Sequence, residues 1–376
     1  MTTKGKRIAY FVHDLGDAAV VRRVQMLHAG GIEVTVLGFR RGDTAPARIE
    51  GARAIDLGRT GNGQFVQRIL AVLRSLARFG AIRRAAAEAD VVMARNLEML
   101  VLAARAAGRR RLIYECLDIH RLLLGSGMAS RLIQAIERAL LRHVDLIVTS
   151  SPRFIADYFH ARRGLTTPVL LIENKVPAFD APVTPAPAAP ARAPWVIGWF
   201  GMLRCRRSLA MLGDIARQSE GRIEVVIAGI PAENEFPDFA AQLEAMPGVR
   251  YVGRYKPADL ATLYAGVHFA WAIDYFEEGL NSTWLLPNRL YESICYGAVP
   301  IALAPVETGA WLARHGVGLT IGDPVQELPG FFAGLDEAQL MAMRDALAAL
   351  PQTDLTIGRA ECAACVAQIL GESAPD

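Results

Sequence analysis

Short apolar runs that alternate with helical stretches constrain the fold of this chain more than any other feature. Six such runs precede residue 177: RIAYFV, EVTVLGF, VVMA, RLIYEC, LIVTSS and PVLLIEN. Five more follow residue 194: WVIGWFG, IEVVIAG, VRYVG, HFAWAI and VPIAL. Strands that alternate with helices form parallel sheets covered by helices. The pattern therefore predicts an α/β protein built from two doubly wound, Rossmann-like domains.

The two sets of strands are separated by PAFDAPVTPAPAAPARAP, a segment with six prolines and few side chains that could form a core. We interpret it as a semi-rigid linker. Two domains also suit a chain of 376 residues, which is long for one hydrophobic core. The predicted division is residues 1–176, the linker 177–194, residues 195–354, and a C-terminal helix within 355–376 that packs back on the first domain.

In open parallel sheets, ligands bind beyond the carboxyl ends of the strands. Two such domains that face each other enclose a cleft, so polar residues just after each strand become site candidates. They are His13, Asp14, Asn96, Asp118, His120, the segment 201–207, Gly229 and the segment 274–281.

The charge is divided unevenly between the two halves of the chain. Residues 1–180 contain 28 Lys and Arg against 16 Asp and Glu, a net charge of +12. Residues 181–376 contain 13 against 22, a net charge of −9, and the two values add to the overall +3. Such an asymmetry indicates that the first half meets an anionic partner.

Several classes of protein are disfavoured by motifs that the chain lacks. The loop after the first strand, HDLGDAAVVRR, contains no G-x-G-x-x-G, and no P-loop pattern occurs, which disfavours NAD enzymes and P-loop NTPases. The start MTTKGKRIAYFV does not resemble a signal peptide, and no apolar run is long enough to span a membrane. The CxxC of Cys362 and Cys365 has no second pair, so a helical tail is favoured over a metal or redox site.

A cluster of arginines follows the first strand of the second half. In GWFGMLRCRRSLAML, Arg204, Arg206 and Arg207 stand between a strand expected to end at Gly201 and a helix. One interpretation is a solvated basic turn. The other is a phosphate or diphosphate site, because guanidinium groups match phosphate oxygens in pairs. The second half is net acidic, so the cluster is not part of a generally basic surface, and the phosphate site is favoured.

The stretch LLPNRLYESICYGAVPI places polar residues in the first turn of a predicted helix that Pro287 begins. Arg289 and Glu292 are three residues apart and could form a surface ion pair. Alternatively, Asn288 and Arg289 at the helix N-terminus bind a phosphate, and Glu292 accepts hydrogen bonds from a ribose.

These segments resemble the donor-binding domain of GT-B glycosyltransferases, in particular family 4, through most of residues 195–321. GMLRCRRS resembles the family's G-R-L-x-x-x-K-G loop, and IEVVIAG resembles the strand that follows. VRYVGRYKPADLATLYAGVHFAW resembles its V-x-x-x-G … L-x-x-x-Y segment, and LLPNRLYESICYGAVPIA resembles its P-N-K-x-x-E motif. In the first half, VVRRVQMLHAGGIEVTVLGF and LIYECLDIHRL are similar to the opening helix and the Y-D-x-H-E loop. The resemblance implies a GT-B fold with an N-terminal acceptor-binding domain and a C-terminal donor-binding domain.

The resemblance also assigns roles to single residues of the predicted donor site. Arg207 stands at the family's phosphate-binding lysine, Arg289 at the lysine of P-N-K, and Glu292 at the glutamate that contacts the donor ribose. Met202 replaces the first phosphate arginine, so we expect Arg204 to take its place in the loop that begins at Gly201.

One family feature is missing, because Trp284 stands eight residues before Glu292, where a second glutamate often contacts the sugar. We therefore expect the sugar contact to come from the segment IDYFEEGLNS. Its candidates are Asp274, Glu277, Glu278 and Asn281.

In the first half, His120 follows a strand and stands two residues after Asp118. A lone histidine is more often structural, but this one could bind the donor's sugar or take a proton from the acceptor hydroxyl. We therefore name His120, Asp118 and Arg207 as catalytic candidates. The acceptor-binding candidates are Asp14, Arg22 or Arg23, and Asn96.

The stretch QRILAVLRSLARFGAIRRAAAEA, which begins at Gln67, carries apolar residues at helical spacing with five arginines among them. It is either an ordinary amphipathic helix packed on the sheet or a surface that rests on anionic lipid.

The sequence therefore predicts a glycosyltransferase that moves a sugar from a UDP or GDP type of donor to a saccharide acceptor, lipid-linked, in bacterial exopolysaccharide or cell-surface glycan assembly. The resemblance implies retention of the anomeric configuration. We expect no cofactor, no metal, no nucleic-acid partner, and a cytoplasmic location with peripheral contact to the inner membrane face. The alternatives are a UDP-sugar 2-epimerase of the same fold and a catalytically inactive nucleotide-sugar-binding protein.

Overall fold

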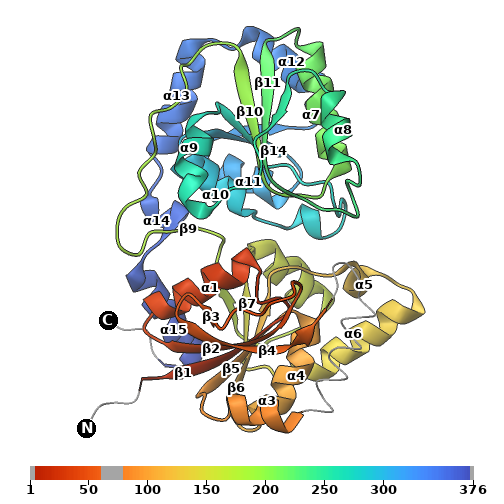
Figure 1. The fold of residues 1–376 in the computed structure, drawn as a ribbon, viewed down its shortest axis with the longest axis vertical. Helices are drawn as coiled ribbons and strands as arrows, with labels where there is room; N and C mark the ends of the chain where they lie inside the picture. The colour runs from red at the N-terminus through yellow and green to blue at the C-terminus, as the bar shows by residue number, and fades with distance from the viewer. Residues whose placement is uncertain (1–4, 61–78, 373–376) are drawn as a thin grey trace. The chain divides into compact units, whose positions relative to one another are not determined.

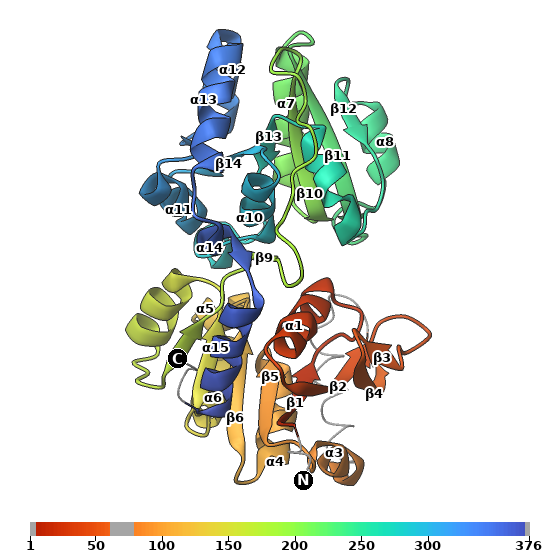
Figure 2. The same cartoon turned by 90° about the vertical axis from the view of Figure 1, so that its left-hand side faces the viewer.

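The computed structural model describes residues 5–60 and 79–372 (Figure 1). The chain forms two compact units. Unit 1 comprises Met1–Glu173 and Ile357–Asp376, and unit 2 comprises Asn174–Thr356. Each unit is built around its own sheet with helices on its faces, which confirms the predicted α/β class (Figures 1 and 2).

Unit 1 contains an eight-stranded sheet in the order β3-β4-β2-β1-β5-β6-β7-β8. All neighbours pair in parallel except β3 and β4, which form an antiparallel edge. The central strands are buried on both faces, as a parallel sheet requires. The strands are β1 (Arg7–Val12), β2 (Glu33–Arg40), β3 (Arg48–Ile49), β4 (Ala52–Arg59), β5 (Val91–Arg95), β6 (Arg111–Cys116), β7 (Leu146–Thr149) and β8 (Val169–Leu171).

The helices of unit 1 include one from the far end of the chain. The helix α15 packs on α1, where a Cβ at Gly30 would lie 2.6 Å from the carbonyl oxygen of Cys362, so glycine permits the close approach. Cys362 and Cys365 both lie buried on α15. In the described part of unit 1 the helices are α1 (Ala18–Ala29), α3 (Phe79–Ala86), α4 (Leu97–Ala107), α5 (Arg121–Leu124), α6 (Met128–Leu141), the π-helix η1 (Phe154–Arg162) and α15 (Arg359–Leu370).

Unit 2 contains a six-stranded, fully parallel sheet in the order β12-β11-β10-β13-β14-β15. A short pair of β9 (Val176–Pro177) and β16 (Thr356–Ile357) forms a separate two-stranded sheet. The six strands are β10 (Trp195–Leu203), β11 (Ile223–Pro231), β12 (Val249–Tyr251), β13 (Phe269–Trp271), β14 (Val299–Leu303) and β15 (Leu319–Ile321).

The helices of unit 2 follow its strands in the order that a doubly wound sheet requires. They are α7 (Arg206–Gln218), α8 (Phe239–Glu244), η2 (Pro257–Asp259), α9 (Leu260–Ala265), η3 (Asn281–Thr283), α10 (Asn288–Cys295), α11 (Glu307–His315), α12 (Pro324–Gly334), α13 (Glu337–Ala348) and α14 (Gln352–Leu355).

The proline-rich segment lies on unit 2 and is held there by hydrogen bonds. The amide of Ala189 donates to the carbonyl of Ala265 at 2.8 Å, and Arg344 Nη1 donates to the carbonyl of Ala189 at 3.1 Å. His268 is buried beneath it, with Nε2 2.8 Å from the Pro190 carbonyl and Nδ1 accepting from the Val196 amide at 2.9 Å. Only the tautomer with hydrogen on Nε2 satisfies both contacts.

The predictions of a basic amphipathic helix and of no membrane span can be compared with the structure only within the described residues. Most of the basic helical stretch that begins at Gln67 lies outside them, and its described part contains α3. Among the residues that the structure describes, no helix has the length and apolar character needed to cross a bilayer.

Candidate functional site

The carboxyl edge of the unit 2 sheet begins with two glycines that face each other on β10 and β11. Gly201 pairs in register with Gly229, where φ is 136° and a Cβ would lie 1.8 Å from the Gly201 carbonyl oxygen. Only glycine fits there. The prediction that the first strand ends at Gly201 was wrong, because pairing with β11 extends β10 to Leu203.

The predicted arginine cluster spans the end of β10 and the first turn of α7. Cys205 caps this helix, and its Sγ accepts a hydrogen bond from the amide of Ser208 at 3.4 Å. Arg204 precedes the cap, whereas Arg207 lies within the first helical turn. The cap therefore separates the two guanidinium groups and directs them to different partners.

Asp274, which follows β13, joins the two predicted halves of the site. Its Oδ2 lies 3.3 Å from Arg204 Nη2 and 3.8 Å from Arg289 Nη2, while its Oδ1 accepts from the amide of Phe276 at 2.8 Å. Burial alone would raise the pKa of Asp274, but the guanidinium groups of Arg289 and Arg204 hold it below its usual value. The carboxylate therefore stays charged and bridges two arginines from distant segments.

Arg207 is supported by the same acidic segment but remains open to solvent. It pairs with Glu278, and its guanidinium lies 4.1 Å from the centroid of the Tyr275 ring. Arg204 lies in the same way over Phe276, at 4.8 Å. Aromatic faces orient guanidinium groups without neutralising them. Because the Arg207 side chain is 51% exposed, its charge is available to a ligand.

Helix α10 confirms the predicted local structure of the second half-site. Pro287 is its N-cap, and Asn288 and Arg289 are its first two residues. Glu292 is buried on the inner side of the helix. Burial, followed by the negative charge of Glu292, raises the pKa of Tyr264 well above its usual value.

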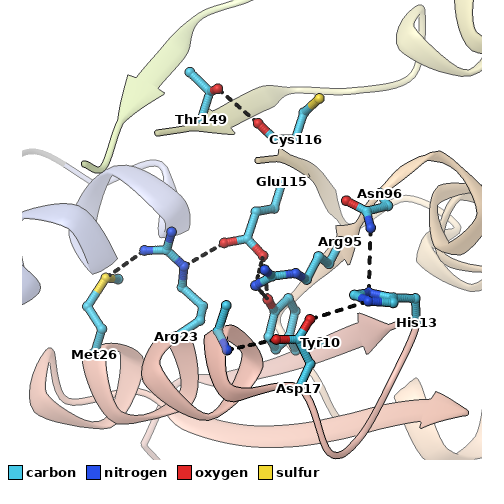
Figure 3. A network of polar contacts seen from close by, with 11 residues as sticks. Tyr10, His13, Asp17, Arg23, Met26, Arg95, Asn96, Glu115, Cys116 and Thr149 are labelled. Atoms are coloured by element: carbon cyan, nitrogen blue, oxygen red, sulfur yellow. Dashed lines mark hydrogen bonds and ion pairs between the residues drawn. The ribbon is translucent and has the colours of Figure 1, made fainter. Parts of the chain in front are cut away.

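The carboxyl edge of the unit 1 sheet carries a second cluster (Figure 3). His13, just after β1, has Nε2 3.3 Å from Asp17 Oδ2 and Nδ1 3.5 Å from Asn96 Nδ2. Asp17 also caps α1 by accepting from the Ala19 amide at 2.8 Å. Burial would raise the pKa of Asp17, but His13 and then Arg95 hold it far below its usual value.

Asn96 adopts a backbone conformation that is rare for any residue with a side chain. Its φ of 67° and ψ of 162° lie in a region that glycine alone occupies readily. Asn96 is the N-cap of α4, yet its side chain makes no capping hydrogen bond and is directed at His13 instead (Figure 3). The amide group of Asn96 therefore faces the His13–Asp17 pair.

A fully buried carboxylate lies close to this pair (Figure 3). Glu115 on β6 accepts a hydrogen bond from the Tyr10 hydroxyl and pairs with Arg23 Nε on α1 at 2.5 Å. Arg95 Nη1 lies 3.6 Å from the same carboxylate. Burial, then the charge of Glu115, raises the pKa of Tyr10, so its hydroxyl remains protonated and donates.

Comparison with known proteins identifies the family. Residues 17–175 match the glycosyl transferase 4-like domain. The chain is 48% identical over 337 residues to the succinoglycan biosynthesis protein ExoL of Rhizobium meliloti (strain 1021). The matched region covers 86% of this chain and 83% of that protein. The chain belongs to this glycosyltransferase family. It is an enzyme of the transferase class, as the sequence predicted.

Solved structures confirm the GT-B fold of this glycosyltransferase. Sucrose-phosphate synthase from Thermosynechococcus elongatus has a TM-score of 0.73 at 14% identity, covering 97% of this chain and 98% of that one. Anabaena Alr3699/HepE in complex with UDP and glucose has a TM-score of 0.72 at 16% identity, covering 97% and 99%. WaaG, a glycosyltransferase of lipopolysaccharide biosynthesis, has a TM-score of 0.62 at 14% identity, covering 93% and 97%.

The remaining catalytic and acceptor-binding candidates of this glycosyltransferase lie in unit 1. Asp14 pairs with Arg41 at 3.0 Å and accepts from the Gly16 amide, and Arg22 lies on α1. His120 is the N-cap of α5, where its Nδ1 accepts from the Leu122 amide at 3.3 Å. The carbonyl of Asp118 accepts a weak hydrogen bond from Cys116 Sγ at 3.7 Å.

Sequence reasoning selected Asp274 and Asn96 but missed several of their partners. His13 appeared among the residues that follow strands, yet nothing marked Asp17 as its partner. Glu115 had a visible signal, because a charged residue inside the apolar run RLIYEC must find partners when that strand is buried. Tyr275 and Phe276 lacked any signal, since their rings matter only through the arginines placed above them.

Proposed function

We propose that this glycosyltransferase moves a sugar from a UDP-sugar to a saccharide acceptor, linked to a lipid, during exopolysaccharide assembly. The biosynthetic context is supported by the succinoglycan biosynthesis protein, which is 48% identical. The donor type is supported by the similar fold of a protein solved with UDP and with UDP-glucose. The family resemblance supports retention of the anomeric configuration.

The observation that carries the proposal is the arginine cluster around Asp274. Arg204, Arg207 and Arg289 gather beside the carboxylates of Asp274 and Glu278 at the carboxyl edge of the unit 2 sheet. A diphosphate would form paired hydrogen bonds with these guanidinium groups. When the glycosidic bond to the donor breaks, the same groups would stabilise the negative charge that grows on the leaving diphosphate.

The rest of the donor would extend along α10 and the acidic segment. Glu292 would accept hydrogen bonds from the ribose hydroxyls, with Tyr264 as its neighbour. Asn288 lies in the first helical turn, where amide groups and the helix dipole favour a phosphate. Asp274 would contact the sugar once the diphosphate takes over its arginines.

The acceptor would bind unit 1 at the carboxyl edge of its sheet. Asn96 and the His13–Asp17 pair present polar groups there, together with Asp14, and Arg22 lies on the helix α1 that follows. His120 remains our candidate for contact with the reacting sugar or the acceptor hydroxyl. The Nδ1 atom of His120 accepts a hydrogen bond from the Leu122 amide. Contact with the sugar or the acceptor hydroxyl would therefore involve Nε2.

The test is calorimetric binding of UDP to the wild type, to Arg207→Ala and to Glu292→Gln. Each variant is expected to weaken UDP binding by about ten- to a hundredfold, as loss of a hydrogen bond to a charged group predicts. Arg217→Ala is the matched control, because Arg217 lies on the same helix α7 and pairs only locally with Asp214 at 3.0 Å.

Equal affinity in all four proteins, or none in the wild type, would contradict the donor site. Incubation with UDP-glucose and a lipid-linked saccharide then separates the remaining functions. Transfer to the saccharide supports our proposal, and its persistence in EDTA supports a metal-independent reaction. Isomerisation of the donor without an acceptor would instead identify an epimerase.

A further inference from the structure

The buried side of helix α6 is held in place by polar contacts rather than by apolar packing alone. Glu137 is fully buried, accepts hydrogen bonds from the Tyr158 hydroxyl at 2.7 Å, and pairs with Arg163 Nε at 2.7 Å. One turn earlier, Gln134 Nε2 donates to the Gly125 carbonyl at 2.8 Å. These contacts determine the rotation of α6 about its own axis.

The opposite side of α6 exposes apolar side chains to water. Met128 is 88% exposed, Leu132 62% and Ile136 37%, and their spacing of four residues places them in one row along the helix. A surface helix normally buries its apolar row and exposes its polar side. Here the fixed rotation of α6 leaves the row outside, at the periphery of unit 1 (Figure 1).

Arginines line one edge of this row. Arg131, Arg138 and Arg142 are all exposed and follow the apolar row at helical spacing. The acidic residue of α6, Glu137, faces the opposite side and is neutralised by Arg163. The outer face of α6 therefore combines a row of apolar side chains with a row of cations and contains no carboxylate.

We propose that the outer face of α6 docks on a bilayer of anionic phospholipids. A helix that lies in the plane of the interface inserts its apolar side chains among the acyl chains and pairs its cations with the headgroups. Met128, Leu132 and Ile136 would insert, and the three arginines would contact phosphate. The inference uses unit 1 alone, so it stands or fails independently of the donor site in unit 2.

Charge argues against another possible occupant. A second copy of this chain would bring the same face against itself in a two-fold dimer, so arginines would oppose arginines. An anionic surface satisfies both rows of the face.

The experiment is co-sedimentation of the full-length protein with vesicles, either pure phosphatidylcholine or phosphatidylcholine with phosphatidylglycerol. We expect binding to the anionic vesicles at low salt, and its loss at high salt. Arg131→Gln combined with Arg138→Gln is expected to weaken binding about thirtyfold, since each basic residue near the surface contributes about 1 kcal/mol. Leu132→Ser is expected to weaken it roughly tenfold.

Matched controls separate this face from the general basicity of unit 1. Arg53→Gln combined with Arg109→Gln removes the same charge from exposed positions on other elements, and Met341→Ser removes an exposed apolar side chain from unit 2. Both controls are expected to bind vesicles like the wild type. Melting temperature and UDP binding are expected to be unchanged in every variant.

Three results would overturn the proposal. The first is that the wild type fails to sediment with anionic vesicles at low salt. The second is that replacing the control arginines, Arg53 and Arg109, weakens binding as much as replacing Arg131 and Arg138. The third is that Leu132→Ser behaves as a change at a protein contact. Dissociation of a dimer in sedimentation velocity would assign the face to a second copy, and a melting temperature lowered as by a core substitution would assign it to another part of the chain.

Discussion

The two sheets of this glycosyltransferase each carry a carboxylate surrounded by arginines at their carboxyl edge, but the two clusters differ in burial and balance. In unit 1, Glu115 is 0% exposed and contacts two arginines and a tyrosine. In unit 2, Asp274 contacts two arginines, while a third, Arg207, is half-exposed on the ring of Tyr275.

The difference shows how one arrangement serves two purposes. A buried charge needs an opposite charge from the protein itself, because an uncompensated charge in the interior costs several kcal/mol. A cluster with partly exposed arginines can exchange its carboxylate for another anion at little cost. The first kind of cluster holds elements together, and the second can receive a ligand.

The largest effect is expected when the buried cluster of unit 1 is broken. Glu115→Ala leaves Arg23 and Arg95 buried without their carboxylate, so the free energy of unfolding is expected to fall by about 3–5 kcal/mol. Urea denaturation followed by circular dichroism measures it. Asp274→Ala, the corresponding change in unit 2, is expected to cost clearly less, and equal losses would refute the distinction between the clusters.

The next effect concerns the ligand that the cluster of unit 2 would receive. Arg289→Ala is expected to weaken UDP binding by about ten- to a hundredfold, because a hydrogen bond to a charged group is worth about 1.5–3 kcal/mol. Arg289→Lys keeps the charge and is expected to retain most of the affinity. Titration calorimetry of both variants decides this, and similar affinities for Ala and Lys would show that Arg289 does not contact the nucleotide.

Asp274→Asn is expected to change UDP affinity in the opposite direction from Arg289→Ala. The amide can still accept from the Phe276 amide but no longer holds Arg204 and Arg289, so UDP is expected to bind about three- to tenfold more tightly. UDP-glucose is expected to gain less, since Asp274 would also contact the sugar. Weaker binding of UDP itself would show that Asp274 positions the arginines rather than competing for them.

The pH dependence of the same variant provides a second check. The lowered pKa of Asp274 means that its contribution to stability is fully present above the pKa of an unfolded aspartate and is lost as pH falls through the lower folded value. Thermal unfolding from pH 6 to pH 3 should therefore separate wild type from Asp274→Asn at the upper end of this range. The two curves should converge at its lower end.

The smallest effect is expected at His268, which holds the proline-rich segment on unit 2. Burial lowers its pKa, so the unfolded chain binds a proton more readily and stability decreases as pH falls below the unfolded value of about 6.5. The melting temperature is expected to fall by about 2 °C between pH 7.5 and pH 5.5. His268→Gln should flatten this slope, whereas the exposed His143→Gln should leave it unchanged.

Much of the fold was predictable from local patterns. Apolar runs of strand length, the six prolines of residues 177–194, and the Pro287 and Gly297 that bound α10 all act over a few residues of chain. The end of β10 was not predictable in this way, because Met202 and Leu203 are held in the strand by their partners on β11. Local signals identify elements, and pairing decides their ends.

The candidate site divides along the same line. The sequence by itself determined that Arg204, Arg207 and Arg289 stand where a strand ends or a helix begins, and that Glu292 stands one turn into a helix, because these positions follow from local periodicity. Only the tertiary structure decided their partners, since Arg204 and Asp274 are 70 residues apart in the chain, Arg207 and Glu278 71, and Arg23 and Glu115 92. Charges so distant in sequence meet only where the sheet brings their segments together, and burial decides which pairs are closed and which remain open to a ligand.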